Sequence, residues 1–149
     1  MKRIVIATDG SPSAREAVEV GLEIAFEQGG DVTFVHVLPP DQFITARNAP
    51  ALAVPHEVDL DESETALREA ADAAEEAGVS FALERVSGET VPEIVAIAEA
   101  READLIVLGS RGRGPLTSAV LGSVSRGVLA HTKTPVLVVR AAKAPVESA

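Results

Sequence analysis

The sequence predicts an α/β fold, a three-layer sandwich in which a parallel sheet lies between two layers of helices. Five short apolar runs alternate along the chain with four segments whose apolar residues recur at helical spacing. Such alternation is typical of parallel sheets joined by right-handed crossovers, with helices on both faces. Several runs are apolar at nearly every position, which indicates strands buried on both sides. At 149 residues the chain has the length of one domain with a sizeable core.

The first three elements follow one another closely. Residues 3–8 are predicted to form a short buried strand. Ser11 is a natural helix N-cap and Pro12 suits the first helical position, so we expect a helix that runs as far as Gly29-Gly30. The second strand, residues 32–38, comes directly after it.

The middle of the chain predicts a long loop, a helix, a strand and the start of another helix. Residues 39–56 contain four prolines and are predicted to form a loop, which at that length could be mobile or functional. From about Asp59 to Ala77 the chain is rich in Ala and Glu and has the apolar stripe of a helix, which Gly78 ends. Residues 79–86 are predicted to be the third strand. Residues 90–93 have the spacing of a capping box, which predicts the start of the third helix.

The last part of the chain contains a fourth strand, a glycine-rich loop, a helix and a fifth strand. The fourth strand is predicted at 105–108, the helix at 123–130 and the fifth strand at 136–140. We therefore place one domain at residues 1–140. Residues 141–149 are predicted to be a flexible tail.

The composition excludes several classes of protein. There is no cysteine, which excludes a disulfide scaffold, a thiolate metal site and cysteine catalysis. No apolar stretch approaches the ~20 residues of a membrane span, and the N-terminus resembles a strand more than a signal peptide. A net charge of −10 should repel nucleic acid and anionic membrane. We expect a cytoplasmic protein that binds neither nucleic acid nor membrane. Its acidity could reflect a salt-loving host, or it could be that of an ordinary acidic cytosolic domain.

The charge is distributed unevenly along the chain. Residues 105–146 contain six Lys and Arg but no Asp or Glu, so they carry +6 and the rest of the chain carries −16. A segment with only basic residues in an acidic chain is a plausible place to receive an anion. The alternative is that these residues merely decorate the ends of helices and strands.

Glycines are concentrated in the same segment. Five of the 11 glycines fall between Gly109 and Gly127. Glycine lets the backbone approach a ligand closely, and free N–H groups at a helix start bind phosphate. Gly122-Ser123 stands where such a helix should begin, although the glycines could instead only build tight turns. The motifs of P-loop NTPases, of dinucleotide-binding enzymes and of the serine nucleophile elbow are all absent.

The spacing of these glycines carries a resemblance to a known family. Gly109, two residues, Gly112, nine residues and then Gly122-Ser123 is similar to the G-x2-G-x9-G-[ST] pattern of the ATP-binding branch of the universal stress protein family. The resemblance covers residues 2–140. Other parts of the chain that resemble the family are 8–11, 35–38 and 134–139.

The resemblance implies a fold, a ligand and a partner. The fold would be Rossmann-like, of the adenine nucleotide alpha-hydrolase kind, with strand order 3-2-1-4-5. ATP would lie in a cleft between strands 1 and 4, with Mg²⁺ bridging its phosphates and no metal ligand from the protein. A homodimer would form largely through the last strand, Val136–Val139.

The resemblance also implies which residues bind the nucleotide. Asp9 would hydrogen-bond the ribose or the adenine, and Val37 would lie against the adenine edge. Leu108 and Gly109 would back the ribose, and the rest of the glycine motif would surround the phosphates. The implied nucleotide-binding residues are Ala7, Thr8, Asp9, Val37, Leu108, Gly109, Arg111, Gly112, Gly122, Ser123, Val124 and Ser125.

Alternatives remain open for the function. The leading hypothesis is a nucleotide-dependent dimer acting in stress response or signalling. No catalytic residue is assigned, so any turnover should be slow. The second hypothesis is an enzyme, either a slow ATP hydrolase or one that phosphorylates itself on an accessible loop hydroxyl. The third is a structural dimer without nucleotide. The accessible hydroxyls would be those of Thr117, Ser118, Ser123 and Ser125.

Four further polar residues have simpler interpretations. Asp9 could cap the first turn, but Ser11 already supplies a cap, which favours a ligand role for Asp9. His36 follows an apolar run and is expected to be a packed or strand-end histidine, not a catalyst. His56 and His131 are solitary, so a metal bound by protein ligands is not expected.

Overall fold

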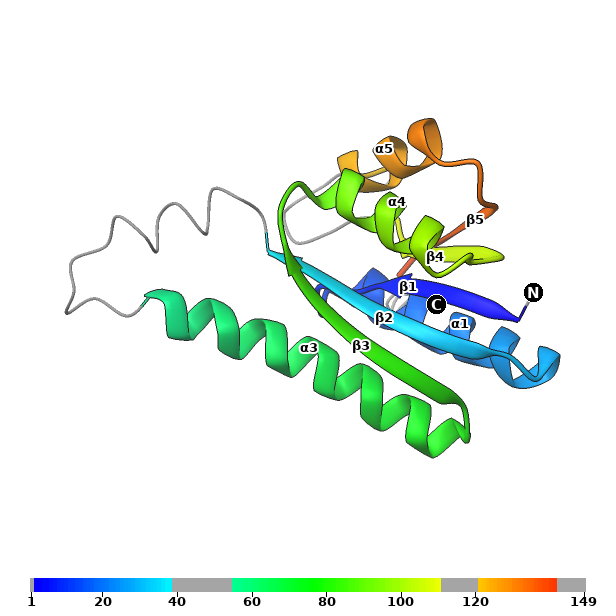
Figure 1. Cartoon of the computed structure of the whole chain (residues 1–149). Helices are drawn as coiled ribbons and strands as arrows, with labels where there is room; N and C mark the ends of the chain where they lie inside the picture. The colour runs from blue at the N-terminus through cyan, green and yellow to red at the C-terminus, as the bar shows by residue number, and fades with distance from the viewer. Residues whose placement is uncertain (1, 39–54, 111–120, 142–149) are drawn as a thin grey trace, which may run out of the picture.

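The elements alternate along the chain as the sequence predicts (Figure 1). The computed structural model describes residues 2–38, 55–110 and 121–141. In chain order the elements are β1 (Arg3–Ala7), α1 (Pro12–Gln28), β2 (Asp31–Leu38), α3 (Pro55–Ala77), β3 (Ser80–Ser87), α4 (Thr90–Ala100), β4 (Leu105–Gly109), α5 (Ser123–His131) and β5 (Val136–Val139).

The strands form one parallel sheet in the order β3-β2-β1-β4-β5, which confirms the predicted order. From β1 the chain moves outward to β2 and β3, and it then adds β4 and β5 on the other side of β1. The strand order therefore switches direction between β1 and β4. In sheets of this kind ligands bind at such a switch, beyond the carboxyl ends of the strands.

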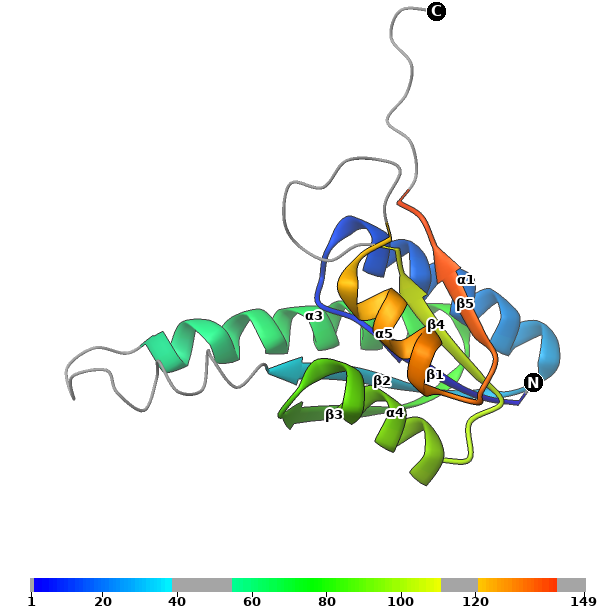
Figure 2. The same ribbon diagram turned by 90° about the horizontal axis from the view of Figure 1, so that it is seen from above.

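In the described part of the chain, α1 and α3 cover one face of the sheet, and α4 and α5 cover the other (Figure 2). Alternate residues of β1 show the two layers: Ile4 and Ile6 pack in a cluster with α1 and α3, and Val5 packs in a second cluster with α4 and α5. Each of these three side chains is at most 1% exposed. Within the described residues, no helix combines the length and apolarity needed to cross a membrane.

Local signals fix the ends of α1 as predicted. Ser11 is the N-cap, its Oγ accepts a hydrogen bond from the Ala14 N–H at 3.3 Å, and Pro12 occupies the first helical position. At the other end Gly29 has a φ of 65°, in the left-handed region that favours glycine. Gly78 follows α3 in the same way, with a φ of 73°.

The predicted capping box at the start of α4 is wrong. Glu89 is the N-cap, Thr90 is already the first helical residue, and no side chain caps the helix. Glu93 is consequently one position too far along to reach back to the cap. Its side chain instead lies against Gly88, where an added Cβ would be 2.7 Å from Glu93 Oε1.

The start of α3 also differs from the prediction. The helix begins at Pro55, four residues before the expected Asp59, and proline is well tolerated in a first helical turn. The predicted loop therefore overlaps the helix at residues 55 and 56, and the rest of that loop lies outside the described residues. Of the predicted tail, only Ala141 is described, without helix or strand.

Asp104 ties β4 to β1 at the edge of the sheet opposite the carboxyl ends. Its Oδ2 accepts the N–H groups of Lys2 and Arg3, both at 3.0 Å. These bonds, Arg3 first and Lys2 second, lower the pKa of the Asp104 carboxyl below its ordinary value. The two central strands are thereby held in register away from the switch point.

Candidate functional site

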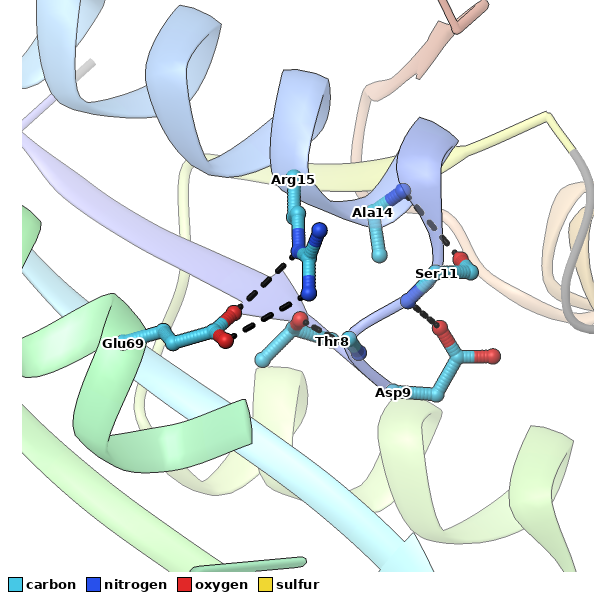
Figure 3. Close-up of polar contacts among 7 residues, drawn as sticks. Thr8, Asp9, Ser11, Ala14, Arg15 and Glu69 are labelled. Atoms are coloured by element: carbon cyan, nitrogen blue, oxygen red, sulfur yellow. Dashed lines mark hydrogen bonds and ion pairs between the residues drawn. The ribbon is translucent and has the colours of Figure 1, made fainter. Parts of the chain in front are cut away.

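The turn after β1 is braced by its own side chains (Figure 3). Gly10 has a φ of 79°, which a residue with a side chain rarely adopts. The Oγ1 of Thr8 accepts the Gly10 N–H at 3.2 Å, and the Oδ1 of Asp9 accepts the Ser11 N–H at 2.9 Å. The carboxylate of Asp9 is therefore held at the carboxyl end of β1, just before the start of α1.

Two bonds attach this turn to β2. The N–H of Thr8 donates to the Val35 carbonyl at 2.9 Å, one residue beyond the last paired residue of β1. The Thr8 carbonyl in turn lies 2.9 Å from Nδ1 of His36. The position of the turn is thus set by the neighbouring strand as well as by its own bonds.

An ion pair joins the first turn of α1 to α3 on the same side of the sheet (Figure 3). The Arg15 Nε lies 3.2 Å from Glu69 Oε2, and Arg15 Nη2 lies 3.4 Å from Glu69 Oε1. Both side chains are substantially exposed, so the pair contributes little to stability. It links α1 to α3 where these two helices lie side by side on the sheet.

Gly109, at the end of β4, touches the start of α1. A Cβ added there would lie 2.5 Å from Ser13 Oγ, 2.7 Å from the Ser13 carbonyl carbon and 2.8 Å from the Ala14 nitrogen. Only a residue without a side chain allows this approach. The glycine therefore brings the end of β4 against the turn that carries Asp9.

The start of α5 is held against the same end of β4. The N–H of Gly122 donates to the Ser110 carbonyl at 2.7 Å, and Ser125 Oγ donates to the Gly109 carbonyl at 2.8 Å. Gly122 is the N-cap and supplies no side-chain cap, and the first-turn N–H groups of α5 have no acceptor within their own helix. Such a helix start, with its positive dipole end, can accept an anion.

The structure brings most of the implied nucleotide-binding residues to this one place. Ala7, Val37 and Val124 line the edge of the cluster under α4 and α5. Leu108 is buried in that cluster, so only its backbone can face a ligand. The remaining described members of the set are Thr8 and Asp9 after β1, Gly109 at the end of β4, and Gly122, Ser123 and Ser125 at the start of α5. Arg111 and Gly112 lie outside the described residues.

One expected hydroxyl is not accessible. Ser125 is only 2% exposed, because its Oγ is turned inward to the Gly109 carbonyl. Its expected availability for phosphorylation is therefore wrong, although its backbone N–H still belongs to the first turn of α5. Ser123 is exposed. Thr117 and Ser118 lie outside the described residues.

Sequence reasoning missed Ser110. This residue is buried, and its backbone joins two elements: its N–H donates to the Val139 carbonyl at 2.7 Å, and its carbonyl accepts from Gly122. The only local signal is its place between a buried strand and a glycine loop. Its partners are distant in sequence, so no spacing rule identifies them.

The basic residues of the 105–146 segment do not all gather at the switch point. Arg126 is exposed in the first turns of α5, at the site. Lys133 instead borders an open hollow at the opposite edge of the sheet, with Lys2 and Asp104. Lys133 therefore fits the alternative expectation, that basic residues simply lie at the ends of helices and strands, and not the expectation of an anion site. Arg111, Arg113 and Lys143 lie outside the described residues.

The fold is that of a doubly wound α/β protein, in which the strand order switches direction between β1 and β4. The model of the universal stress protein family matches residues 1–140. The chain belongs to the universal stress protein family.

Relatives and solved structures support the same assignment. Universal stress protein MJ0531 of Methanocaldococcus jannaschii is 36% identical over 142 residues, covering 95% of this chain and 84% of the relative. The structure of hypothetical protein MJ0577 superposes with a TM-score of 0.78 at 27% identity, covering 96% of this chain and 98% of that one. A universal stress protein solved in complex with cAMP superposes with a TM-score of 0.68 at 29% identity, covering 95% of this chain and 98% of that one.

Proposed function

We propose that this protein binds ATP, accompanied by Mg²⁺, between the carboxyl ends of β1 and β4. In this proposal it acts in the cytoplasm as a nucleotide-dependent dimer in stress response or signalling. The observation that carries the proposal is the start of α5, where the N-cap Gly122 supplies no side-chain cap and two hydrogen bonds hold the helix against the end of β4. The solved relative in complex with cAMP supports an adenine nucleotide as the ligand.

The phosphates would lie at the start of α5. The N–H groups of Ser123, Val124 and Ser125 are the first-turn donors there, and Gly122 leaves room for an anion to approach the backbone. The hydroxyl of Ser123 is exposed and can add a further bond. That of Ser125 is already committed to the Gly109 carbonyl.

The adenosine would lie nearer to β1 and β2. Asp9 is held by its Ser11 bond at the carboxyl end of β1, where a carboxylate oxygen can accept from a ribose hydroxyl. Ala7 and Val37 offer small apolar side chains at the edge of the α4–α5 cluster. An adenine ring would find an apolar surface there.

The residues present fit a nucleotide better than a metal site built by the protein. Among the residues whose side chains the structure describes (2–38, 64–110 and 121–141), no group of three or more His, Cys, Asp or Glu could hold a metal ion. Mg²⁺ would therefore be held by phosphate oxygens, and it would offset the charge of the triphosphate in an acidic protein.

The proposed dimer would form at β5. This strand lies at the edge of the sheet, and its four apolar residues, Val136–Val139, are each only half-buried. An apolar edge strand invites pairing, and a second copy of the chain would cover it. Sedimentation of the full chain should give the mass of two copies, and a monomer at every concentration tested would contradict this part of the proposal.

Calorimetry with ATP and AMP, with and without Mg²⁺, tests the ligand directly. Mass spectrometry of the freshly purified protein should also reveal bound adenine nucleotide. No binding at millimolar ATP would refute the proposal and leave a structural dimer as the alternative. Turnover above ~1 per second would instead favour an enzyme.

A further inference from the structure

We propose that His36 is a positioning residue for the adenosine half of the nucleotide, acting through the carbonyl of Thr8. This inference rests on the proposed function above. It adds a residue from the opposite face of the sheet, one whose type and place in the sequence predict only a packed or strand-end histidine.

The hydrogen bond fixes which ring nitrogen carries the proton. The Nδ1 of His36 lies 2.9 Å from the Thr8 carbonyl oxygen. A carbonyl oxygen can only accept, so Nδ1 must be the protonated nitrogen of the neutral ring. The ring is therefore held as the Nδ1–H tautomer and donates to the turn.

This bond works together with a backbone bond one residue away. The N–H of Thr8 donates to the Val35 carbonyl at 2.9 Å. Two consecutive residues of β2 thus hold Thr8: the Val35 carbonyl binds its N–H, and the His36 ring binds its carbonyl. The local bonds of Asp9 and Gly10 set the shape of the turn, whereas these two bonds set its distance from β2.

His36 acts without touching the nucleotide pocket on the α4–α5 side. Successive side chains of a strand point to opposite faces. Val35 and Val37 pack in the α4–α5 cluster, and Phe34 packs in the α1–α3 cluster, so His36 lies on the α1–α3 face. The same strand, β2, therefore presents Val37 to the proposed adenine site on one face. From the other face, its His36 side chain holds the turn that carries Asp9.

Two substitutions separate the hydrogen bond from simple packing. His36→Asn keeps an N–H donor close to the position of Nδ1, and His36→Leu keeps the bulk but removes the donor. A threefold to tenfold change in Kd corresponds to about 0.65–1.4 kcal/mol, which lies within the net worth of one hydrogen bond. His36→Leu should therefore raise the Kd for ATP and for AMP by about threefold to tenfold, whereas His36→Asn should stay within about twofold of the wild type.

Inorganic tripolyphosphate and a second histidine provide the controls. Tripolyphosphate needs only the start of α5, so its affinity should be unchanged in both variants. The Nδ1 of His131 makes the same kind of bond, 2.8 Å from the Gly127 carbonyl, at the far end of α5. His131→Leu should leave the affinities for ATP and AMP unchanged.

Nitrogen NMR of the histidine rings tests the tether without any ligand. At a pH where the rings are neutral, the His36 signal, assigned from its loss in His36→Asn, should show a protonated Nδ1 and an unprotonated Nε2. The reverse pattern would overturn the proposal.

The binding results can also contradict it in three ways. These are unchanged affinity in His36→Leu, equal losses in the Asn and Leu variants, or an equal loss for tripolyphosphate. Each of these overturns the role of His36 while leaving the proposed function intact. If the wild-type protein binds neither ATP nor AMP, the proposed function fails and the role of His36 fails with it.

Discussion

Gly109→Ala should weaken both the fold and the site, because two backbone segments meet at this glycine. The new Cβ would lie 2.5 Å from Ser13 Oγ, and 2.7 and 2.8 Å from backbone atoms of Ser13 and Ala14. A serine hydroxyl can rotate away, but helix backbone cannot. To restore ordinary contact with these backbone atoms, α1 and β4 must separate by about 0.6–0.7 Å.

Overpacking of this kind costs about 1–3 kcal/mol. Urea denaturation should show that loss in the free energy of unfolding. The same displacement moves the Asp9 turn away from the end of β4, so the affinity for ATP should fall by about tenfold, since misplacements near 1 Å are costly at a preorganised site.

Gly29→Ala is the matched control. Gly29 has nothing within 4 Å of an added Cβ, but its φ of 65° makes alanine costly by about 1 kcal/mol. This variant should lose stability and keep its affinity for ATP, because Gly29 lies at the far end of α1. If Gly109→Ala matches the wild type within about 0.5 kcal/mol and binds ATP equally well, the close-contact argument is refuted.

Three further predictions concern single residues. Gly122→Val should lower ATP affinity at least about tenfold with the fold retained. The φ of −65° and ψ of 162° at this position suit any residue, so the loss would come from the bulk of the valine side chain near the phosphate. An unchanged affinity by calorimetry would place the anion elsewhere. Asp9→Ala should weaken ATP but spare inorganic triphosphate, and an equal loss of both would contradict its ribose role. The Asp104 carboxyl has a lowered pKa in the fold, so its contribution to stability is present at neutral pH and disappears as the pH falls below about 3.9 and through the folded pKa. Asp104→Asn should therefore be less stable than the wild type at pH 7 and approach it in acid; a gap in denaturation midpoint that does not vary with pH would oppose this.

The sequence predicts those parts of the fold that depend on local signals. Ser11 and Pro12 mark the start of α1 because a cap and a fixed φ act within one turn. The capping box of α4 fails because Thr90 fits either the cap or the first turn, and only the path of the chain from Gly88 decides between them.

The candidate site depends more on distant contacts, which the sequence does not reveal. The glycine pattern indicates an anion pocket near Gly109 and Gly122. The pattern cannot reveal that Gly109 lies against Ser13, or that the Ser125 hydroxyl donates a hydrogen bond to the Gly109 carbonyl. Both contacts join residues that are far apart in the chain and depend on the packing of α1, β4 and α5 together.

The bond between the Gly122 N–H and the Ser110 carbonyl also has a consequence for the number of residues that can stand between them. Ser110 and Gly122 are twelve positions apart in the chain, yet the Gly122 nitrogen lies 2.7 Å from the Ser110 oxygen. The bond joins these two residues directly, and the entropy of closing a longer stretch of chain between two joined residues rises only slowly with its length. An insertion between Ser110 and Gly122 should therefore cost little in the stability of β4 and α5, as long as this bond is kept.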